Sequence, residues 1–339
     1  MSKRAIQGTV AGLGLLFLIL DSKTALNGAI NAVNLCLGSV VPSIFPFLVL
    51  SPVLVSAISG QHLPLLRPIG CALGIPMGAE GIFLSGILGG YPTGAQAVCN
   101  AWQSGQLSRE DTQRMLTFCS NAGPSFIFGI LGMKFSQVWL PWLLWGIHIL
   151  SAVMVAITMP REKHSEKIIF NSSPCTLVQS LKQAVRTMAL ICGWVVLFRV
   201  MLAFIDRWVL WLVPTSVRVG IYGVLELANG CCSLDQVVSE GMRFIICSGM
   251  LAFGGICVVM QTASVTGNLG VKTYIFGKIL QTLFSIILST IVQILLIPTK
   301  DTVKISPYFV LIPALGILFS MFITRKGKIR GSIPSRIVV

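Results

Sequence analysis

Two short polar runs interrupt this otherwise apolar chain, and their residue types suit the binding of a solute. One run is Gly90-Tyr91-Pro92-Thr93-Gly94, and the other is Glu226-Leu227-Ala228-Asn229-Gly230. Glycine and proline break helices, and a broken helix at membrane depth survives only where protein or a water-filled cavity satisfies its backbone. Breaks at corresponding places in two halves of a chain are a pointer to a transporter's substrate site. We therefore predict that both runs bind substrate, through Gly90, Tyr91, Pro92, Thr93, Gly94, Glu226, Asn229 and Gly230.

Glu226 is the most informative single residue of these runs. A carboxylate within a transmembrane segment is costly unless it is paired or hydrated, so it marks a site by default. The alternative is an ordinary surface loop over 216–236, in which Glu226 would simply be solvated. The sequence leaves both readings open.

A third polar segment, at 121–126, places an amide and a proline inside an apolar stretch. Pro124 has no backbone N–H and frees a carbonyl near Gly123. With Asn121 and Ser125, such carbonyls could coordinate an ion or a polar substrate; the alternative is a kinked helix whose polar groups satisfy one another. Arg199 also lies in an apolar stretch, where it could pair with Asp206 or attract an anionic substrate.

The composition excludes most other classes of protein. The chain has 339 residues, of which 54% are hydrophobic and 11% charged, and its mean hydropathy is +0.85, so we expect an integral membrane protein rather than a soluble fold. The net charge of +14 falls in short loops and tails, which is typical of the positive-inside rule and not of nucleic-acid binding. The expected partners are membrane lipid and a small-molecule substrate, with no nucleic acid; a homo-oligomer stays open.

No catalytic constellation is visible. We find no nucleophile and base pair, phosphate loop or metal-ligand spacing, and the three histidines lie far apart at 62, 148 and 164. We therefore predict no enzyme and no cofactor. A coupling ion, Na⁺ or H⁺, is not specified by these residues.

The apolar segments and the basic clusters together predict the topology. A membrane-crossing helix needs about 20 residues, and the apolar segments lie at 6–20, 29–58, 69–98, 113–133, 138–159, 187–212, 216–236, 241–262, 272–297 and 306–324. All basic clusters fall on the cytoplasmic side only if 69–98 and 216–236 enter the membrane and turn back. We therefore predict an all-α polytopic membrane protein with about eight transmembrane helices and two re-entrant hairpins, and with cytoplasmic N- and C-termini.

The order of these segments repeats, which predicts an inverted repeat of the kind found in many secondary transporters. Each half has a long span, a hairpin and two further spans. The predicted parts are an N-terminal signal-anchor span (1–28), a first repeat (29–159), a cytoplasmic linker (160–186), a second repeat (187–297), and a last span with a basic tail (298–339).

Three motifs, at 89–95, 121–126 and 223–230, resemble those of the nucleoside-recognition "Gate" membrane proteins. They are most similar to the YlbJ-like group of sporulation integral membrane proteins, over about residues 30–300. The resemblance implies a Gate-domain fold related to concentrative nucleoside transporters, with two hairpins that cradle the substrate. It also implies transport of dipicolinic acid across the outer forespore membrane of an endospore former, with that membrane or the cell membrane as the location. Ala228 departs from the group's pattern, which often has threonine or serine there, so a hydroxyl contact at this position is in doubt.

Two alternatives to this function remain at the level of sequence. One is a transporter of nucleosides or of another polar solute, with Glu226 binding sugar hydroxyls or a coupling cation. The other is a membrane scaffold for spore envelope assembly that transports nothing.

Overall fold

The computed structural model describes residues 3–58, 66–161 and 175–296. All regular secondary structure in these ranges is helical, as predicted. Five helical stretches of the described residues are long and apolar enough to cross a membrane: Ser22–Ala57, Leu140–Thr158, Leu177–Trp208, Glu240–Leu269 and Lys272–Leu296. The total of about eight crossings stays a prediction, and the last predicted span, 306–324, lies outside the described residues.

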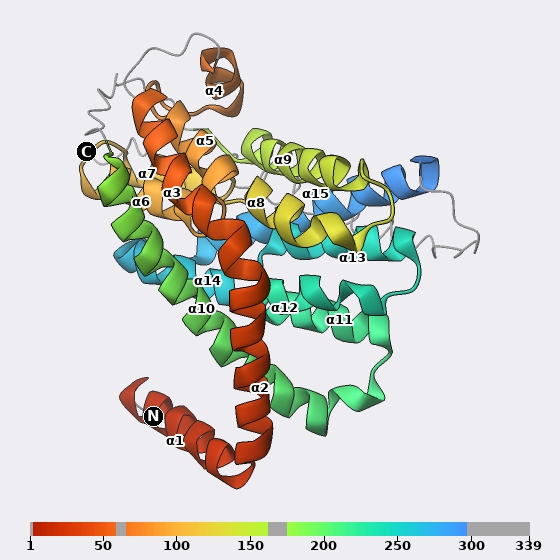
Figure 1. Ribbon diagram of the computed structural model, residues 1–339. Helices are drawn as coiled ribbons and strands as arrows, with labels where there is room; N and C mark the ends of the chain where they lie inside the picture. The colour runs from red at the N-terminus through yellow and green to blue at the C-terminus, as the bar shows by residue number, and fades with distance from the viewer. Residues whose placement is uncertain (1–2, 59–65, 162–174, 297–339) are drawn as a thin grey trace, which may run out of the picture.

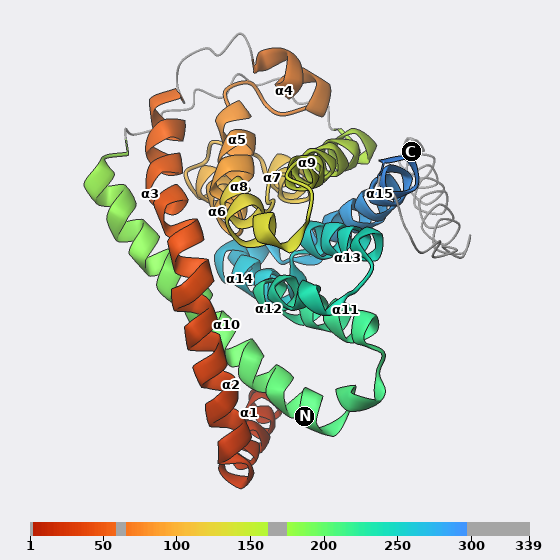
Figure 2. The ribbon, with the colours of Figure 1, turned by 45° about the vertical axis from the view of Figure 1, so that its right-hand side comes forward.

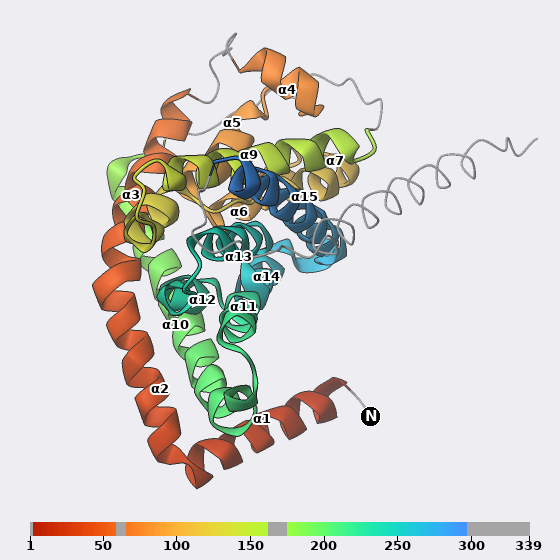
Figure 3. The same ribbon diagram turned by 90° about the vertical axis from the view of Figure 1, so that its right-hand side faces the viewer.

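A long rod forms one side of the molecule. Helix α2 (Ser22–Leu35) continues through a π-helical turn (Cys36–Val40) into α3 (Val41–Ile58), and α1 (Lys3–Leu20) leaves its lower end at an angle (Figure 1). Helix α10 (Leu177–Trp208) packs along this rod and runs in the opposite direction (Figure 3). The two approach closely because Gly28 has no side chain: a Cβ there would lie 3.0 Å from Ala203 Cβ.

Helix α10 begins earlier than the sequence suggested. Thr176 and Gln179 form a capping box, in which each side chain accepts a hydrogen bond from the other residue's backbone N–H. The helix therefore starts at Leu177 rather than near 187. Consequently Lys182 and Arg186 lie on a helix instead of in the predicted linker, whose residues 162–174 fall outside the described part of the chain.

The rest of the first half consists of shorter helices. They are α4 (Arg67–Leu73), α5 (Glu80–Gly89), α6 (Thr93–Gln103), α7 (Arg109–Leu116), α8 (Pro124–Phe126), which continues as a π-helical turn (Ile127–Leu131), and α9 (Leu140–Thr158). The apolar segment 113–133 is interrupted at the place where the sequence has Pro124. The backbone of Gly123 is extended, with ψ 159°, and Pro124 starts a new helix because proline suits a first helical turn.

The second half also combines short helices with longer ones. After α10 come the short helices α11 (Thr215–Leu225) and α12 (Leu227–Cys232), then α13 (Glu240–Phe253), α14 (Gly255–Thr266) and the continuous helix α15 (Lys272–Leu296). Helices α11 and α12 lie beside α13, and α14 packs against α6 and α11 (Figure 2). The predicted span 241–262 is interrupted at Gly254, whose φ of 81° is left-handed. The inverted relation of the halves and the re-entrant placement of the short helices stay predictions.

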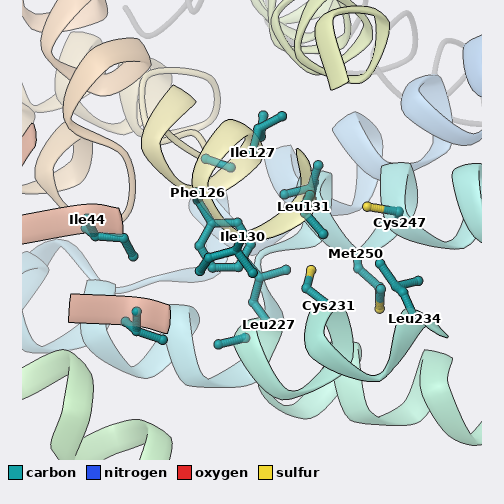
Figure 4. Close-up of a cluster of buried hydrophobic side chains, with 14 of the residues drawn as sticks. Ile44, Phe126, Ile127, Ile130, Leu131, Leu227, Cys231, Leu234, Cys247 and Met250 are labelled. Atoms are coloured by element: carbon teal, nitrogen blue, oxygen red, sulfur yellow. The ribbon is translucent and has the colours of Figure 1, made fainter. Parts of the chain in front are cut away.

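The hydrophobic core joins the two halves. Phe126, Ile127 and Leu131, which follow the extended segment of the first half, pack with Leu227 and Cys231 of α12 (Figure 4). Met250 of α13 and Ile44 of α3 belong to the same cluster. The interrupted helices of both halves are thereby fixed against each other by apolar packing.

Candidate functional site

A cavity of about 50 Å³ lies where the helix breaks of the two halves meet. Its polar and backbone lining comes from Gly90, Tyr91, Gly123, Ser125, Glu226 and Gln261, and its apolar lining includes Val40, Ile44, Phe126, Ile191, Val195 and Val258. Five of the residues predicted to bind substrate therefore share one cavity, although they come from three separate segments of the chain. This volume holds only a few water molecules.

The first break separates α5 from α6. Gly90, with φ 75°, ends α5, and a cis peptide bond joins Tyr91 to Pro92 before α6 starts at Thr93. A Cβ on Gly90 would lie 2.9 Å from the backbone N of Gly123, so the break and the extended segment touch through their backbones. Pro92 and Thr93 are not among the cavity-lining residues.

Gly94, on the first turn of α6, has a packing role. A Cβ there would lie 2.0 Å from the carbonyl oxygen of Cys119, and one on Gly86 of α5 would lie 1.7 Å from the same oxygen. These two glycines let the carbonyl sit between α5 and α6. Gly94 therefore positions the break without lining the cavity.

The extended segment between α7 and α8 is satisfied by buried side chains. The Asn121 amide donates to the Phe118 carbonyl at 2.8 Å, and its Oδ1 accepts a hydrogen bond from Gln281 Nε2 at 3.0 Å. The backbone N–H of Ala122 donates to His148 Nε2 at 2.9 Å. Asn121 thus has protein partners, while Ser125 and Gly123 line the cavity, and the binding of an ion or substrate by this segment stays a prediction.

The second break is built around Glu226. Its side chain is 3% exposed, so the alternative of a solvated loop residue is wrong. Glu226 Oε1 accepts a hydrogen bond from Ala228 N at 3.0 Å, and Oε2 accepts from Asn229 N at 2.7 Å and Asn229 Nδ2 at 2.6 Å. The carboxylate thus caps the N-terminus of α12, where helix dipoles favour negative charge. Gly230 follows, and a Cβ on it would lie 2.3 Å from Gly223 Cα.

Comparison with known proteins agrees with an integral membrane protein. Over 297 residues the chain is 26% identical to "Sporulation integral membrane protein YlbJ" of Bacillus subtilis (strain 168), an alignment that covers 73% of this chain and 72% of that protein. The chain is an integral membrane protein that is similar to YlbJ. No family model matches it, so the Gate-domain relationship implied by the motifs stays a prediction. No solved structure matches it either.

Arg199 of this YlbJ-like protein lies on α10, half-buried and within electrostatic reach of Glu226. It does not line the cavity. The suggested ion pair with Asp206 is not formed among the described residues; Asp206 instead accepts a hydrogen bond from the hydroxyl of Tyr222. Arg199 therefore contributes positive charge near the second break and makes no contact with the cavity itself.

The sequence reading missed Lys278 and Gln281 of the YlbJ-like chain. Both lie on α15, and both are fully buried beside the extended segment. A signal was present, because a lysine within an apolar segment is as costly as a glutamate and marks a site by the same rule.

Tyr91 connects the first break to the second half of the YlbJ-like chain. Its hydroxyl donates to the Leu251 carbonyl of α13 at 3.1 Å and accepts a hydrogen bond from Lys278 Nζ at 3.3 Å. Tyr91 also lines the cavity.

Replacing Tyr91 by phenylalanine should lower the stability of the protein by about 1–2 kcal/mol, because two buried partners lose their hydrogen bond while the ring stays in place. Thermal unfolding in mild detergent would measure this. Thr9→Val on the exposed helix α1 is the control, and its midpoint should equal that of the wild type. An equal midpoint for Tyr91→Phe and wild type would contradict the assigned link.

Proposed function

We propose that this YlbJ-like protein is a membrane carrier that binds a small solute in the cavity between its two helix breaks. One observation carries the proposal: Tyr91 of the first break and Glu226 of the second line the same cavity, with Gly123 of the extended segment. In transporters built from repeats, discontinuous helices of the two halves meet at the substrate site. A scaffold protein would have no need of polar breaks that converge in its interior.

The size of the cavity adds a mechanistic point. Small-molecule sites have volumes of roughly 300–1,000 Å³, whereas this cavity measures about 50 Å³. A solute larger than a few waters therefore needs more room than this cavity offers, and we expect a break to move away from the extended segment to make that room. The backbone contact between Gly90 and Gly123 is the boundary that has to open.

The lining favours a small solute with a flat ring. Tyr91 and Phe126 supply aromatic faces, aliphatic side chains supply the rest of the walls, and Ser125, Gln261 and the backbone of the breaks supply polar contacts. Dipicolinate, which the sequence resemblance implies, is a planar ring with two carboxylates, and Arg199 near Glu226 would favour such an anion. Uridine, the solute of the alternative reading, also has a flat ring.

Uptake into proteoliposomes tests the proposal, with radiolabelled dipicolinate and radiolabelled uridine in parallel. We expect saturable dipicolinate uptake that falls at least tenfold in Glu226→Gln, because we assign the Glu226 carboxylate in the lining to the proton or cation that crosses with the anion, and glutamine cannot bind it. Glu110→Gln, an exposed carboxylate on α7, is the matched control and should transport as wild type does.

The outcomes separate the candidates. Saturable uridine uptake in place of dipicolinate would keep the carrier and change the substrate. Failure of both solutes to enter liposomes that contain folded protein, or full uptake by Glu226→Gln, would overturn the proposed site.

A further inference from the structure

Lys278 has an unusual environment for a charged residue within a membrane helix. Its side chain is fully buried, and no carboxylate among the described residues forms an ion pair with it. Burial of an unpaired charge is strongly unfavourable, so a neutral side chain would serve better if the position needed only packing. The positive charge of Lys278 therefore has to be stabilised by other groups, and the identity of those groups indicates the role of this lysine.

The partners of Lys278 are oxygen atoms from three elements. Its Nζ donates to the Ser120 carbonyl of the extended segment, to Gln281 Oε1 of α15 at 2.7 Å, and to the Tyr91 hydroxyl at the first break at 3.3 Å. The Tyr91 hydroxyl donates its own hydrogen to the Leu251 carbonyl. Three acceptors require three hydrogens, and a lysine has three only as the ammonium ion.

The aromatic rings around Lys278 also suit a cation. Nζ lies 5.1 Å from the ring centroid of Tyr91 and 5.7 Å from that of Tyr274, within the range of cation–π attraction. The other ionisable groups near it are the Cys119 thiol and the His148 imidazole, which accepts a backbone hydrogen bond and so carries a lone pair on Nε2. None of these neighbours supplies a formal negative charge.

An unwound segment between two half-helices is where transporters of this architecture hold a dissolved coupling cation, through freed carbonyls and the negative C-terminal end of a half-helix. Here the carbonyl of Ser120, just past the C-terminus of α7, is already occupied by the ammonium group. We propose that Lys278 is a tethered cation that takes the place of a dissolved Na⁺ at the extended segment and holds that segment against the first break.

The proposal predicts a protein that is indifferent to Na⁺ until the tether is removed. When Na⁺ is replaced by choline, the initial rate of wild-type uptake should change by less than twofold. The wild-type thermal midpoint in detergent should stay the same within error. Lys278→Ala keeps the oxygen acceptors and leaves space among them. Its uptake in choline should fall at least tenfold and its midpoint should drop, and Na⁺ or methylammonium should restore both in part. Lys272→Ala, an exposed lysine on the same helix, is the matched control and should behave as wild type.

The uptake experiment rests on the proposed transport function, whereas the measurement of the thermal midpoint does not. If no solute is transported but the midpoint of Lys278→Ala rises with Na⁺ or methylammonium, transport fails and the tethered cation stands. A saturable stimulation of wild-type uptake or stability by Na⁺ would overturn the tethered-cation proposal. So would a Lys278→Ala protein that matches wild type in choline, or one that responds to neither Na⁺ nor methylammonium. If Lys278→Ala does not fold, two other measurements decide the question. One uses Lys278→Met, whose longer side chain fills the space, and the other is the wild-type response to Na⁺.

Discussion

Replacing Gly86 by alanine is expected to destabilise the protein by at least about 3 kcal/mol, the upper part of the range for overpacked interiors. The new Cβ would lie 1.7 Å from the Cys119 carbonyl oxygen, 2.8 Å from its carbon and 3.4 Å from Gly94 Cα. All three atoms belong to the backbone, so no side chain can rotate away to make room. Thermal unfolding of the purified protein in mild detergent measures the effect.

Gly146→Ala is the matched control for this experiment. Gly146 lies within α9, and a Cβ there meets no atom within 4 Å. The same substitution should therefore be neutral, or stabilising by less than about 1 kcal/mol through helix propensity. If Gly86→Ala unfolds at the wild-type midpoint, α5 and α6 do not enclose the Cys119 carbonyl in the way the structure shows.

Replacing Glu226 by alanine is expected to cost about 3 kcal/mol, because three buried donors lose their acceptor and each unsatisfied group costs about 1–3 kcal/mol. The donors are Ala228 N and both nitrogens of Asn229. Since α12 is only six residues long, the loss of its cap should unravel it and expose the second break. Hydrogen–deuterium exchange of residues 227–232, together with the thermal midpoint, reports this change.

Glu226→Gln separates the cap from the charge. The glutamine retains one oxygen acceptor, and the Asn229 amide can rotate to receive its N–H, so the loss of stability should stay near about 1 kcal/mol. If Glu226→Gln keeps α12 stable and protected from exchange but no longer transports, the negative charge of Glu226 is needed for transport of the solute and not for the cap. Equal exchange protection of residues 227–232 in Glu226→Ala and wild type would show that the carboxylate is not the cap.

The sequence by itself determined the membrane class and the places where helices break. Apolar runs long enough to span a bilayer require helices, because lipid offers no partners for backbone groups. Gly90, Pro124 and the stretch from Glu226 to Gly230 stood out because glycine and proline change the local backbone whatever surrounds them. Such local rules also exposed Glu226 as a costly residue. They could not show that its carboxylate accepts hydrogen bonds from Ala228 and Asn229.

Only the tertiary structure decided which residues meet. The convergence of Tyr91, Gly123 and Glu226 on one cavity depends on packing between segments far apart in the chain, for which a single sequence carries no signal. The interruption at Gly254 was missed because one glycine in an apolar run is compatible with a helix, and only its left-handed φ of 81° reveals the break. The role of Lys278 also depends on the tertiary structure, because its partners, the Ser120 carbonyl and the Tyr91 hydroxyl, come from distant segments of the chain. The environment of a buried charge is made by its neighbours in space.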